Sequence, residues 1–260
     1  MNLHTDDELA RLLGQPIRER TTIHQWPLSI VQCLTLTDGT RLAYKSQLPP
    51  TVEPEFYARA ASPLLTRCRD LGVLGDCHIL VLDWIETRVA IDVTHARQVV
   101  DAIGGIKGDP PVYTDIGTPD AWAATVADTF DKLSRFHHGP VDELRRWAES
   151  PAVMQKIAEG SRVCHGDLKP EQVFLTENGY RLIDWQRPVK GPADLDLVCL
   201  LIELAVDPLA YTDAATVQLH WFLRLRWVVE SRVDIFPGVK NDFLDHWPAK
   251  AIERIPRIGR

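Results

Sequence analysis

Residues 163–187 read VCHGDLKPEQVFLTENGYRLIDWQR, and this stretch predicts a short β-hairpin. Two strand-like runs, residues 173–175 and 181–183, are separated by the turn Thr176-Glu177-Asn178-Gly179-Tyr180. Asn-Gly is a strong hairpin turn signal because both residues tolerate positive φ. We therefore expect the two runs to pair as antiparallel strands.

The hairpin brings together side chains that suit phosphoryl transfer. Paired strands lie about 4.8 Å apart, so Gln172, just before the first strand, should lie near Asp184, just after the second. Asp167 precedes Gln172 by five residues on a tight loop opened by Gly166, and it can face the same point. A carboxylate that holds Mg²⁺, an oxygen ligand beside it and a second carboxylate that orients a hydroxyl are the groups that this reaction uses. The alternative is a surface hairpin flanked by incidental acids.

The segment HGDLKPEQ followed by IDW resembles the catalytic segment of the aminoglycoside phosphotransferase and choline kinase branch of the protein-kinase-like fold. The resemblance implies that Asp167 is the catalytic base or hydroxyl-orienting residue and that Asp184 is the main Mg²⁺ ligand. Gln172 stands where the family usually has Asn, and the maltokinase-like branch is similar in carrying Gln there as a metal ligand. Lys169 resembles the lysine that contacts the transferred phosphate in protein serine/threonine kinases; a solvated loop lysine is the alternative.

Composition places the chain among globular proteins. With 260 residues, of which 45% are hydrophobic, it can bury a core in one large domain or two packed lobes. A net charge of −7 argues against general affinity for nucleic acid or anionic membranes. No apolar run approaches the roughly 20 residues that span a bilayer. The five cysteines form no Cys-x-x-Cys pair, and the acidic N-terminal stretch is unlike a signal peptide, so we expect a cytoplasmic protein with reduced thiols.

Residues 18–46 predict antiparallel strands, with Asp38-Gly39 as a hairpin turn. This region resembles the start of a kinase small lobe, in which Lys45 would be the strand-three lysine that pairs with the α- and β-phosphates of ATP. The family's first turn is usually glycine-rich, but residues 24–29 contain no glycine. Ser29 is the candidate for one phosphate contact there; a plain turn serine is the alternative.

A helix is predicted from Glu53 to about Leu71. In kinases a glutamate on this helix pairs with the strand-three lysine. We expect Glu55 to have that role, with Glu53 in reserve. The buried strand that follows breaks at Asp83 and resembles the inter-lobe hinge, where backbone groups of Asp83 and Ile85 would bond the adenine edge; an ordinary core strand is the alternative.

Several further positions resemble the family. Asp196 occupies the position whose carboxylate receives backbone N–H groups from the catalytic loop, with Asp194 as the alternative. His165 resembles a histidine that supports that loop by hydrogen bonds, although a histidine beside an aspartate can also be a general base. Acceptor specificity in the family usually comes from C-terminal helices and their acids, for which the candidates are Glu203, Asp207, Glu230 and Asp234.

The predicted fold class is α+β: a bilobal protein-kinase-like fold with a small antiparallel-sheet lobe (residues 1–82), a hinge (83–86) and a mostly helical large lobe (87–260). The implied activity is transfer of the ATP γ-phosphoryl group, with Mg²⁺, to a hydroxyl of a small molecule such as a sugar, an aminoglycoside or an amino alcohol. No nucleic-acid or membrane partner is expected, and the oligomeric state is left open. A pseudokinase that binds a nucleotide or a partner and a protein kinase are the two alternative functions.

Overall fold

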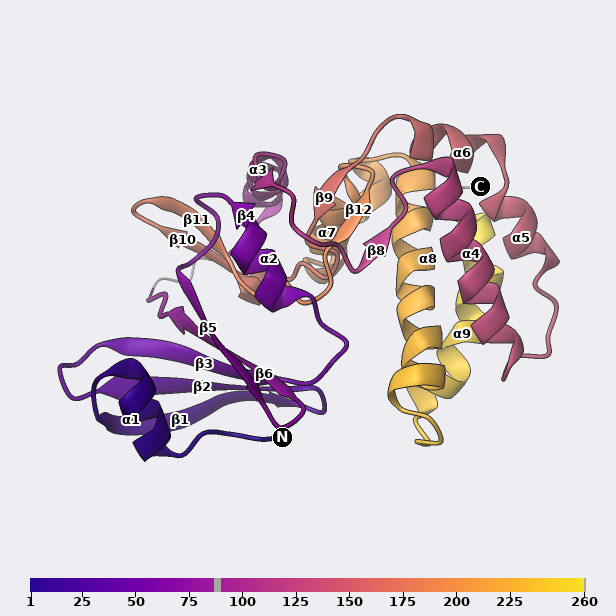
Figure 1. Cartoon of the computed structure of the whole chain (residues 1–260). Helices are drawn as coiled ribbons and strands as arrows, with labels where there is room; N and C mark the ends of the chain where they lie inside the picture. The colour runs from indigo at the N-terminus through magenta and orange to yellow at the C-terminus, as the bar shows by residue number, and fades with distance from the viewer. Residues whose placement is uncertain (87–89, 260) are drawn as a thin grey trace. The chain divides into compact units, whose positions relative to one another are not determined.

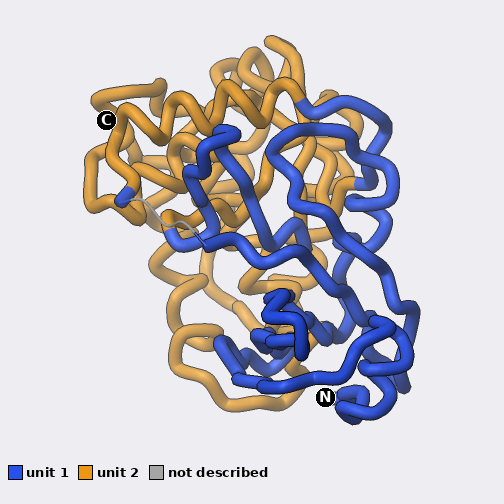
Figure 2. The backbone as a smooth tube through the Cα atoms, turned by 90° about the vertical axis from the view of Figure 1, so that its left-hand side faces the viewer, with its two compact units in different colours: residues 1–90, 106–111, 171–186 blue, residues 91–105, 112–170, 187–260 orange. Residues whose placement is uncertain are grey.

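The computed structural model describes residues 1–86 and 90–259. It divides into two compact units, which Figure 2 shows in blue and orange. Unit 1 comprises residues 1–90, 106–111 and 171–186, and unit 2 comprises residues 91–105, 112–170 and 187–260. Residues 87–89, where the large lobe was expected to begin, lie outside the described residues, and the predicted lobe boundary stays a prediction.

Unit 1 is built on a five-stranded sheet with the order β1-β2-β3-β6-β5, in which all neighbours are antiparallel. This confirms the predicted antiparallel N-terminal sheet. The turn between the first two strands contains only Pro27 and Leu28, so the hairpin is tight. The strands are β1 (Ile17–Trp26), β2 (Ser29–Leu36), β3 (Arg41–Gln47), β5 (Cys68–Leu74) and β6 (Cys77–Asp83).

One face of this sheet carries a helix at the start of the chain. Helix α1 (Asp6–Leu13) begins at Thr5, whose side chain forms a capping box with Glu8. It ends at Gly14, which has φ 78°, the left-handed backbone that glycine adopts most readily. The buried side chain of Leu9 packs in the apolar cluster on this face of the sheet. Successive side chains of a strand point to opposite faces of the sheet. Tyr44 belongs to this apolar cluster, so Lys45, the next residue of β3, points to the opposite face.

The second helix of unit 1 is shorter than predicted. Helix α2 spans Glu53–Arg59, and the chain then forms a two-residue strand, β4 (Ala60–Ala61), which pairs with β7 (Lys107–Gly108). Ser62 precedes Pro63, and a residue before proline avoids helical backbone. The prediction that the helix continues to about Leu71 is wrong, because Leu71 lies within the edge strand β5.

The predicted hairpin is present in unit 1, over residues 173–182. Strand β10 (Val173–Thr176) pairs antiparallel with β11 (Gly179–Leu182), and the register joins Val173 to Leu182 and Thr176 to Gly179. Gly179 has φ 90°, the positive value that the turn signal predicts. The hairpin therefore confirms the local prediction, with the two strands joined through Glu177 and Asn178.

Unit 2 is mostly helical. Figure 1 shows α4 and α9 alongside the long helix α8, and each of the two contacts α8. Their shared core contains Trp122, Trp147 and Phe222, with ring centroids 4.9 to 6.1 Å apart. The helices are α3 (Val93–Ile103), α4 (Pro119–Ser134), α5 (Asp142–Ala148), α6 (Pro151–Ala158), α7 (Leu195–Glu203), α8 (Ala214–Glu230) and α9 (Asp242–Arg254).

A small sheet in unit 2 holds the segment before the predicted catalytic loop. Its central strand β12 (Val189–Gly191) pairs parallel with β8 (Thr114–Asp115) and antiparallel with β9 (Arg162–Cys164). The loop that contains Asp167 leaves β9 directly. In the described part of the chain, no helix is long and apolar enough to cross a membrane.

Candidate active site

Lys45 makes the central ion pairs of unit 1. It lies in the interior of the sheet, where it pairs in register with Val31 on one side and Leu80 on the other. Its Nζ atom lies 2.6 Å from Glu53 Oε2 and 2.7 Å from Asp184 Oδ1. Burial works to lower the pKa of Lys45, but the two carboxylates, Asp184 first, outweigh it and raise the pKa. The ammonium group is therefore charged at neutral pH and fixed between two acids.

The partner of Lys45 on helix α2 is Glu53, which corrects the prediction of Glu55. Glu53 is completely buried, and its other oxygen accepts the backbone N–H of Trp185 at 3.1 Å. Three residues along the same helix face, Phe56 stacks on the Trp185 ring with centroids 4.5 Å apart. Glu55 is exposed on the other side of the helix. The reserve candidate is therefore the one that makes the ion pair.

Glu53→Gln should lower the free energy of unfolding by about 3 kcal/mol, because breaking a buried ion pair leaves a buried charge with less compensation. Glu55→Gln is the matched control on the same helix, and its effect should stay within about 0.5 kcal/mol, as for an exposed side chain. Urea unfolding of the two variants and the native protein measures both values. Equal losses of stability in the two variants would contradict the assignment of Glu53.

Asp184 joins Lys45 to Gln172. Its Oδ2 atom accepts the Gln172 Nε2–H at 3.0 Å, so the hairpin brings these two side chains together as the sequence predicts. The Asp184 backbone has φ 76°, a left-handed conformation that is costly for a residue other than glycine and occurs mostly at functional sites. Gln172 is buried, whereas about a third of the Asp184 side chain is exposed. The Asp184 carboxylate is therefore accessible to a ligand.

The Gln172 and Asp184 pair suits a hard cation. Among the described residues there is no group of three or more histidine, cysteine or acidic side chains that could hold a metal ion. A carboxylate and an amide oxygen are nevertheless donors that Mg²⁺ accepts, since this ion takes few protein ligands and completes its shell with water and phosphate oxygens. Turning the Gln172 amide by 180° presents its oxygen where its nitrogen now lies. The donor set thus fits Mg²⁺.

Ser29 lies on the same face of the sheet as Lys45. It pairs in register with Gln47, two positions beyond Lys45, and residues two apart in a strand share a face. The Ser29 side chain is buried at the start of β2. The Asp83 backbone, at the end of β6, donates to Arg67 O at 3.0 Å, and Ile85 follows outside the strand. Contacts of Ser29, Asp83 and Ile85 with a nucleotide stay predictions.

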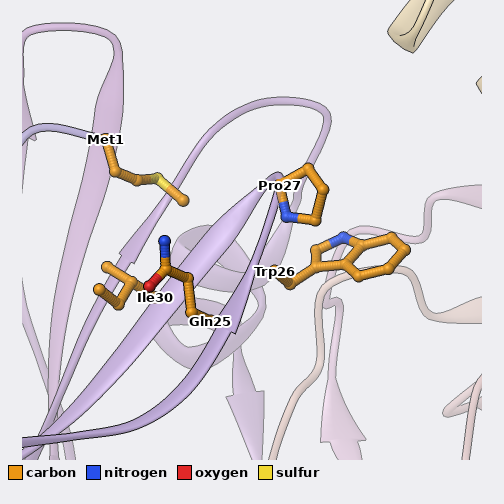
Figure 3. Close-up of a pocket in the computed structure, with 5 residues that line it drawn as sticks. All are labelled: Met1, Gln25, Trp26, Pro27 and Ile30. Carbon is orange, nitrogen blue, oxygen red and sulfur yellow. The ribbon is translucent and has the colours of Figure 1, made fainter. Parts of the chain in front are cut away.

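A cavity of about 470 Å³ lies beside the tight β1–β2 turn (Figure 3). Gln25 and Ile30, which pair with each other across the two strands, line it. Ile30 is adjacent to Val31, the register partner of Lys45, and therefore points to the opposite face of the sheet. This cavity is not part of the Lys45 site.

The loop that carries Asp167 belongs to unit 2 and is fixed by Asp196. The buried Asp196 carboxylate accepts the backbone N–H of His165 at 2.7 Å and of Gly166 at 2.9 Å. Burial raises the pKa of Asp196, although His165 and the two N–H groups oppose that shift. Asp194, the alternative, pairs with Arg97 instead. The expected role of Asp196 is confirmed.

Gly166 allows the loop to pass close to another segment. It has φ 85°, and a Cβ atom there would lie 2.7 Å from the backbone oxygen of Arg187, which is too close. The next residue, Asp167, has a side chain that is 45% exposed, and Lys169 Nζ lies 3.6 Å from its carboxylate. The two predicted catalytic residues are therefore neighbours on one preorganised loop.

Solved structures of kinases share the fold of this chain. A thermostable mutant of aminoglycoside phosphotransferase APH(4)-Ia, in ternary complex with AMP-PNP and hygromycin B, is 14% identical and covers 97% of this chain and 98% of its own, with a TM-score of 0.59. A choline/ethanolamine kinase family protein from Mesorhizobium loti is 15% identical over 97% and 92% of the two chains, with a TM-score of 0.62. Choline kinase LicA from Streptococcus pneumoniae is 12% identical over 96% and 97%, with a TM-score of 0.60.

These likenesses confirm the predicted α+β, protein-kinase-like fold. No curated protein sequence matches the chain. The sequence model of the phosphotransferase enzyme family matches residues 54–224. This range begins directly after Glu53 and contains the Asp167 loop and Asp184. Because that match covers well over half of the chain, the protein belongs to the phosphotransferase enzyme family.

Proposed function

We propose that this protein transfers the γ-phosphoryl group of ATP to a hydroxyl group of a small molecule, with Mg²⁺ as the cofactor. The observation that carries the proposal is the Lys45 ammonium held between Glu53 and Asp184, with Asp184 in a left-handed backbone conformation and bonded to Gln172. Membership of a phosphotransferase family supports the reaction class. The APH(4)-Ia structure contains an ATP analogue, which supports ATP as the donor.

Lys45 would bind the phosphates of the nucleotide, and Glu53 would hold it in place. Together with Asp184 these groups carry one positive and two negative charges, so they would repel a nucleotide that arrived without a cation. The positive charge of Mg²⁺, when it is bound, would offset that repulsion. Asp184 and Gln172 are the residues that would hold it, while Ser29 would add a hydroxyl contact on the Lys45 side of the sheet.

Side chains would have a larger part in phosphate binding in this protein than the backbone of the β1–β2 turn. The β1–β2 turn contains only Pro27 and Leu28, and proline has no N–H to donate. A glycine-rich loop would instead present several N–H groups to the phosphates. We therefore assign phosphate binding mainly to Lys45.

Asp167 would orient the acceptor hydroxyl and take its proton. Its carboxylate is accessible, and the loop that carries it is held by the two N–H bonds to Asp196. Lys169, beside it, would stabilise negative charge on the phosphoryl group in transit. Positioning and electrostatic stabilisation supply most of the catalysis in phosphoryl transfer, and a preorganised loop provides both.

Thermal unfolding with ATP, in the presence and absence of Mg²⁺, tests the nucleotide and metal parts of the proposal. A ligand at 100 times its dissociation constant stabilises a protein by about 2.7 kcal/mol. For a chain of this size that corresponds to roughly 5 to 10 °C in Tm. We expect the rise to require Mg²⁺, and ADP release in an acceptor screen to follow. No rise under either condition would overturn the proposal, and a rise without ADP release from any acceptor would favour the pseudokinase.

A further inference from the structure

Most acidic candidates for acceptor recognition in unit 2 are already paired. Glu230 lies 3.0 Å from Arg226, and Asp234 lies 2.9 Å from Lys132. The Asp207 carboxylate accepts the N–H of Leu209 and caps a short helical turn. A cationic acceptor would have to displace these internal partners. Of the four acidic candidates, the exposed Glu203 is therefore the one that a cationic acceptor could reach without displacing an internal partner in the described part of the chain.

Two arginines in unit 2 show the opposite pattern. Within residues 1–86 and 90–259, neither Arg187 nor Arg224 has a carboxylate partner or a hydrogen-bond acceptor. The Arg187 guanidinium stacks on the Trp227 ring, with Cζ 3.5 Å from the ring centroid. Stacking fixes the plane of the guanidinium and leaves the N–H groups at its edge available to an anion. Both arginines are only partly exposed.

Arg224 is on the same side of α8 as this stack. It precedes Trp227 by three residues, and residues three apart on a helix share a face. Its charge also reaches His220, one turn earlier, where burial first and Arg224 second lower the histidine pKa to about 3. The face of α8 around Trp227 therefore carries Arg224, which has no carboxylate partner among the described residues, and Glu230, which is paired with Arg226.

The two arginines lie close to the Asp167 loop. The backbone oxygen of Arg187 adjoins Gly166, which directly precedes Asp167. Helix α7, which carries Cys199, packs against α8, which carries Arg224. Burial raises the pKa of Cys199, the acids Asp167, Asp196 and Glu203 raise it further, and Arg224 lowers it. An anion bound by the arginines would lie near the carboxylate that orients the acceptor hydroxyl.

We propose that Arg187 and Arg224 bind an anionic group of the acceptor, so that the substrate is a hydroxyl compound with a carboxylate or a phosphate, such as a sugar acid or a sugar phosphate. A guanidinium binds either oxyanion through paired N–H groups. This inference rests on the proposed function. In the reaction the acceptor oxygen bonds to the γ-phosphorus, the bond from that phosphorus to the β–γ bridging oxygen breaks, ADP leaves with the electron pair, and the hydroxyl proton passes to Asp167 and then to water.

Matched acceptors that differ only in charge test this specificity. D-gluconate, sorbitol and N-methyl-D-glucamine share a polyhydroxyl chain and are anionic, neutral and cationic, and glycerol 3-phosphate, glycerol and 3-amino-1,2-propanediol form a second series. We expect ADP release with Mg²⁺ and ATP to have a kcat/KM at least about 10-fold higher for an anionic member than for its neutral and cationic counterparts, as hydrogen bonds to charged groups allow.

Variants separate acceptor binding from a structural role. Arg187→Gln should lower kcat/KM for the anionic acceptor about 10- to 100-fold, through its KM, while KM for ATP stays unchanged. Arg187→Lys should recover part of the loss. Arg254→Gln, the same change at an exposed arginine at the end of α9, is the matched control that should change neither value. Melting temperatures of all variants show whether each one folds.

Three results would overturn the inference. One is a preference for neutral or cationic members, another is no turnover of any anionic member although Mg²⁺ and ATP stabilise the protein, and the third is an Arg187→Gln variant that loses activity equally with every acceptor. Failure of Mg²⁺ and ATP to stabilise the native protein is a different result, because it overturns the proposed function and this inference with it.

Discussion

Asp184→Asn is expected to lower kcat about 1,000-fold or more and to abolish stabilisation by Mg²⁺ and ATP. Asparagine has nearly the same shape and also tolerates the left-handed backbone of this position, so the fold should survive. The substitution removes the charge that pairs with Lys45 and that would hold the cation, and electrostatic stabilisation of this kind dominates phosphoryl transfer. Steady-state ADP release and melting curves with Mg²⁺ and ATP measure the two effects.

The exposed Asp76, in the turn before β6, provides the control for this experiment. Asp76→Asn makes the same chemical change in unit 1, far along the chain from the Lys45 group, and should alter neither kcat nor the ATP-dependent shift in Tm. An Asp184→Asn protein with near-native turnover would exclude the proposed mechanism.

Asp167→Asn should lower kcat by about 100- to 10,000-fold, which is the usual contribution of a positioned general base. Nucleotide affinity should persist, because the contacts assigned to ATP are made by Lys45, Asp184 and Gln172 and not by Asp167. Calorimetric titration with ATP and Mg²⁺ gives the affinity, and ADP release gives kcat.

Glu171→Gln serves as the control for Asp167→Asn, since it also removes an exposed carboxylate from the same stretch of chain. Its kcat should be native-like. If Asp167→Asn instead weakened ATP binding and kept the turnover of bound ATP, then Asp167 would act on the nucleotide, and the assignment of a proton acceptor would be wrong.

The parts of the site that depend on local sequence were predictable. The hairpin of residues 173–182 follows from its turn residues and strand-like runs, and its register brings Gln172 to Asp184 at 3.0 Å. Lys45 follows from the resemblance of its strand to strand three of a kinase small lobe, and not from the strand pattern alone. Predicting the two N–H bonds to Asp196 required the family resemblance, because their donors, His165 and Gly166, lie about 30 residues earlier in the chain.

The errors come from contacts between distant segments. The helix that begins at Glu53 was predicted too long because the pairing of β4 with residues 107–108 competes with helix formation after Arg59. Pro63 was the local signal for that end. The choice of Glu55 over Glu53 was wrong because only one face of α2 packs on Trp185, and the spacing from Glu53 to Phe56 was the available signal.

The arginine stack on Trp227 was beyond reach of sequence reasoning. Arg187 and Trp227 are 40 residues apart, and an aromatic residue on a helix can equally well serve the core. Phe222 does so, but Trp227 is only partly buried and carries the guanidinium. Telling these two roles apart requires knowing which side of α8 faces the core and which loop passes over its other side.

The start of helix α2 is fastened by one contact to strand β3 and by three contacts to the segment that follows Asp184. Glu53 pairs with Lys45 and accepts the Trp185 N–H, the N–H of Val52 donates to Gln186 O at 3.1 Å, and Phe56 stacks on Trp185. Moving the helix aside would break all of these contacts at once. We therefore expect helix α2 to keep this position, and the pair of Glu53 and Lys45 to stay formed, for as long as unit 1 is folded.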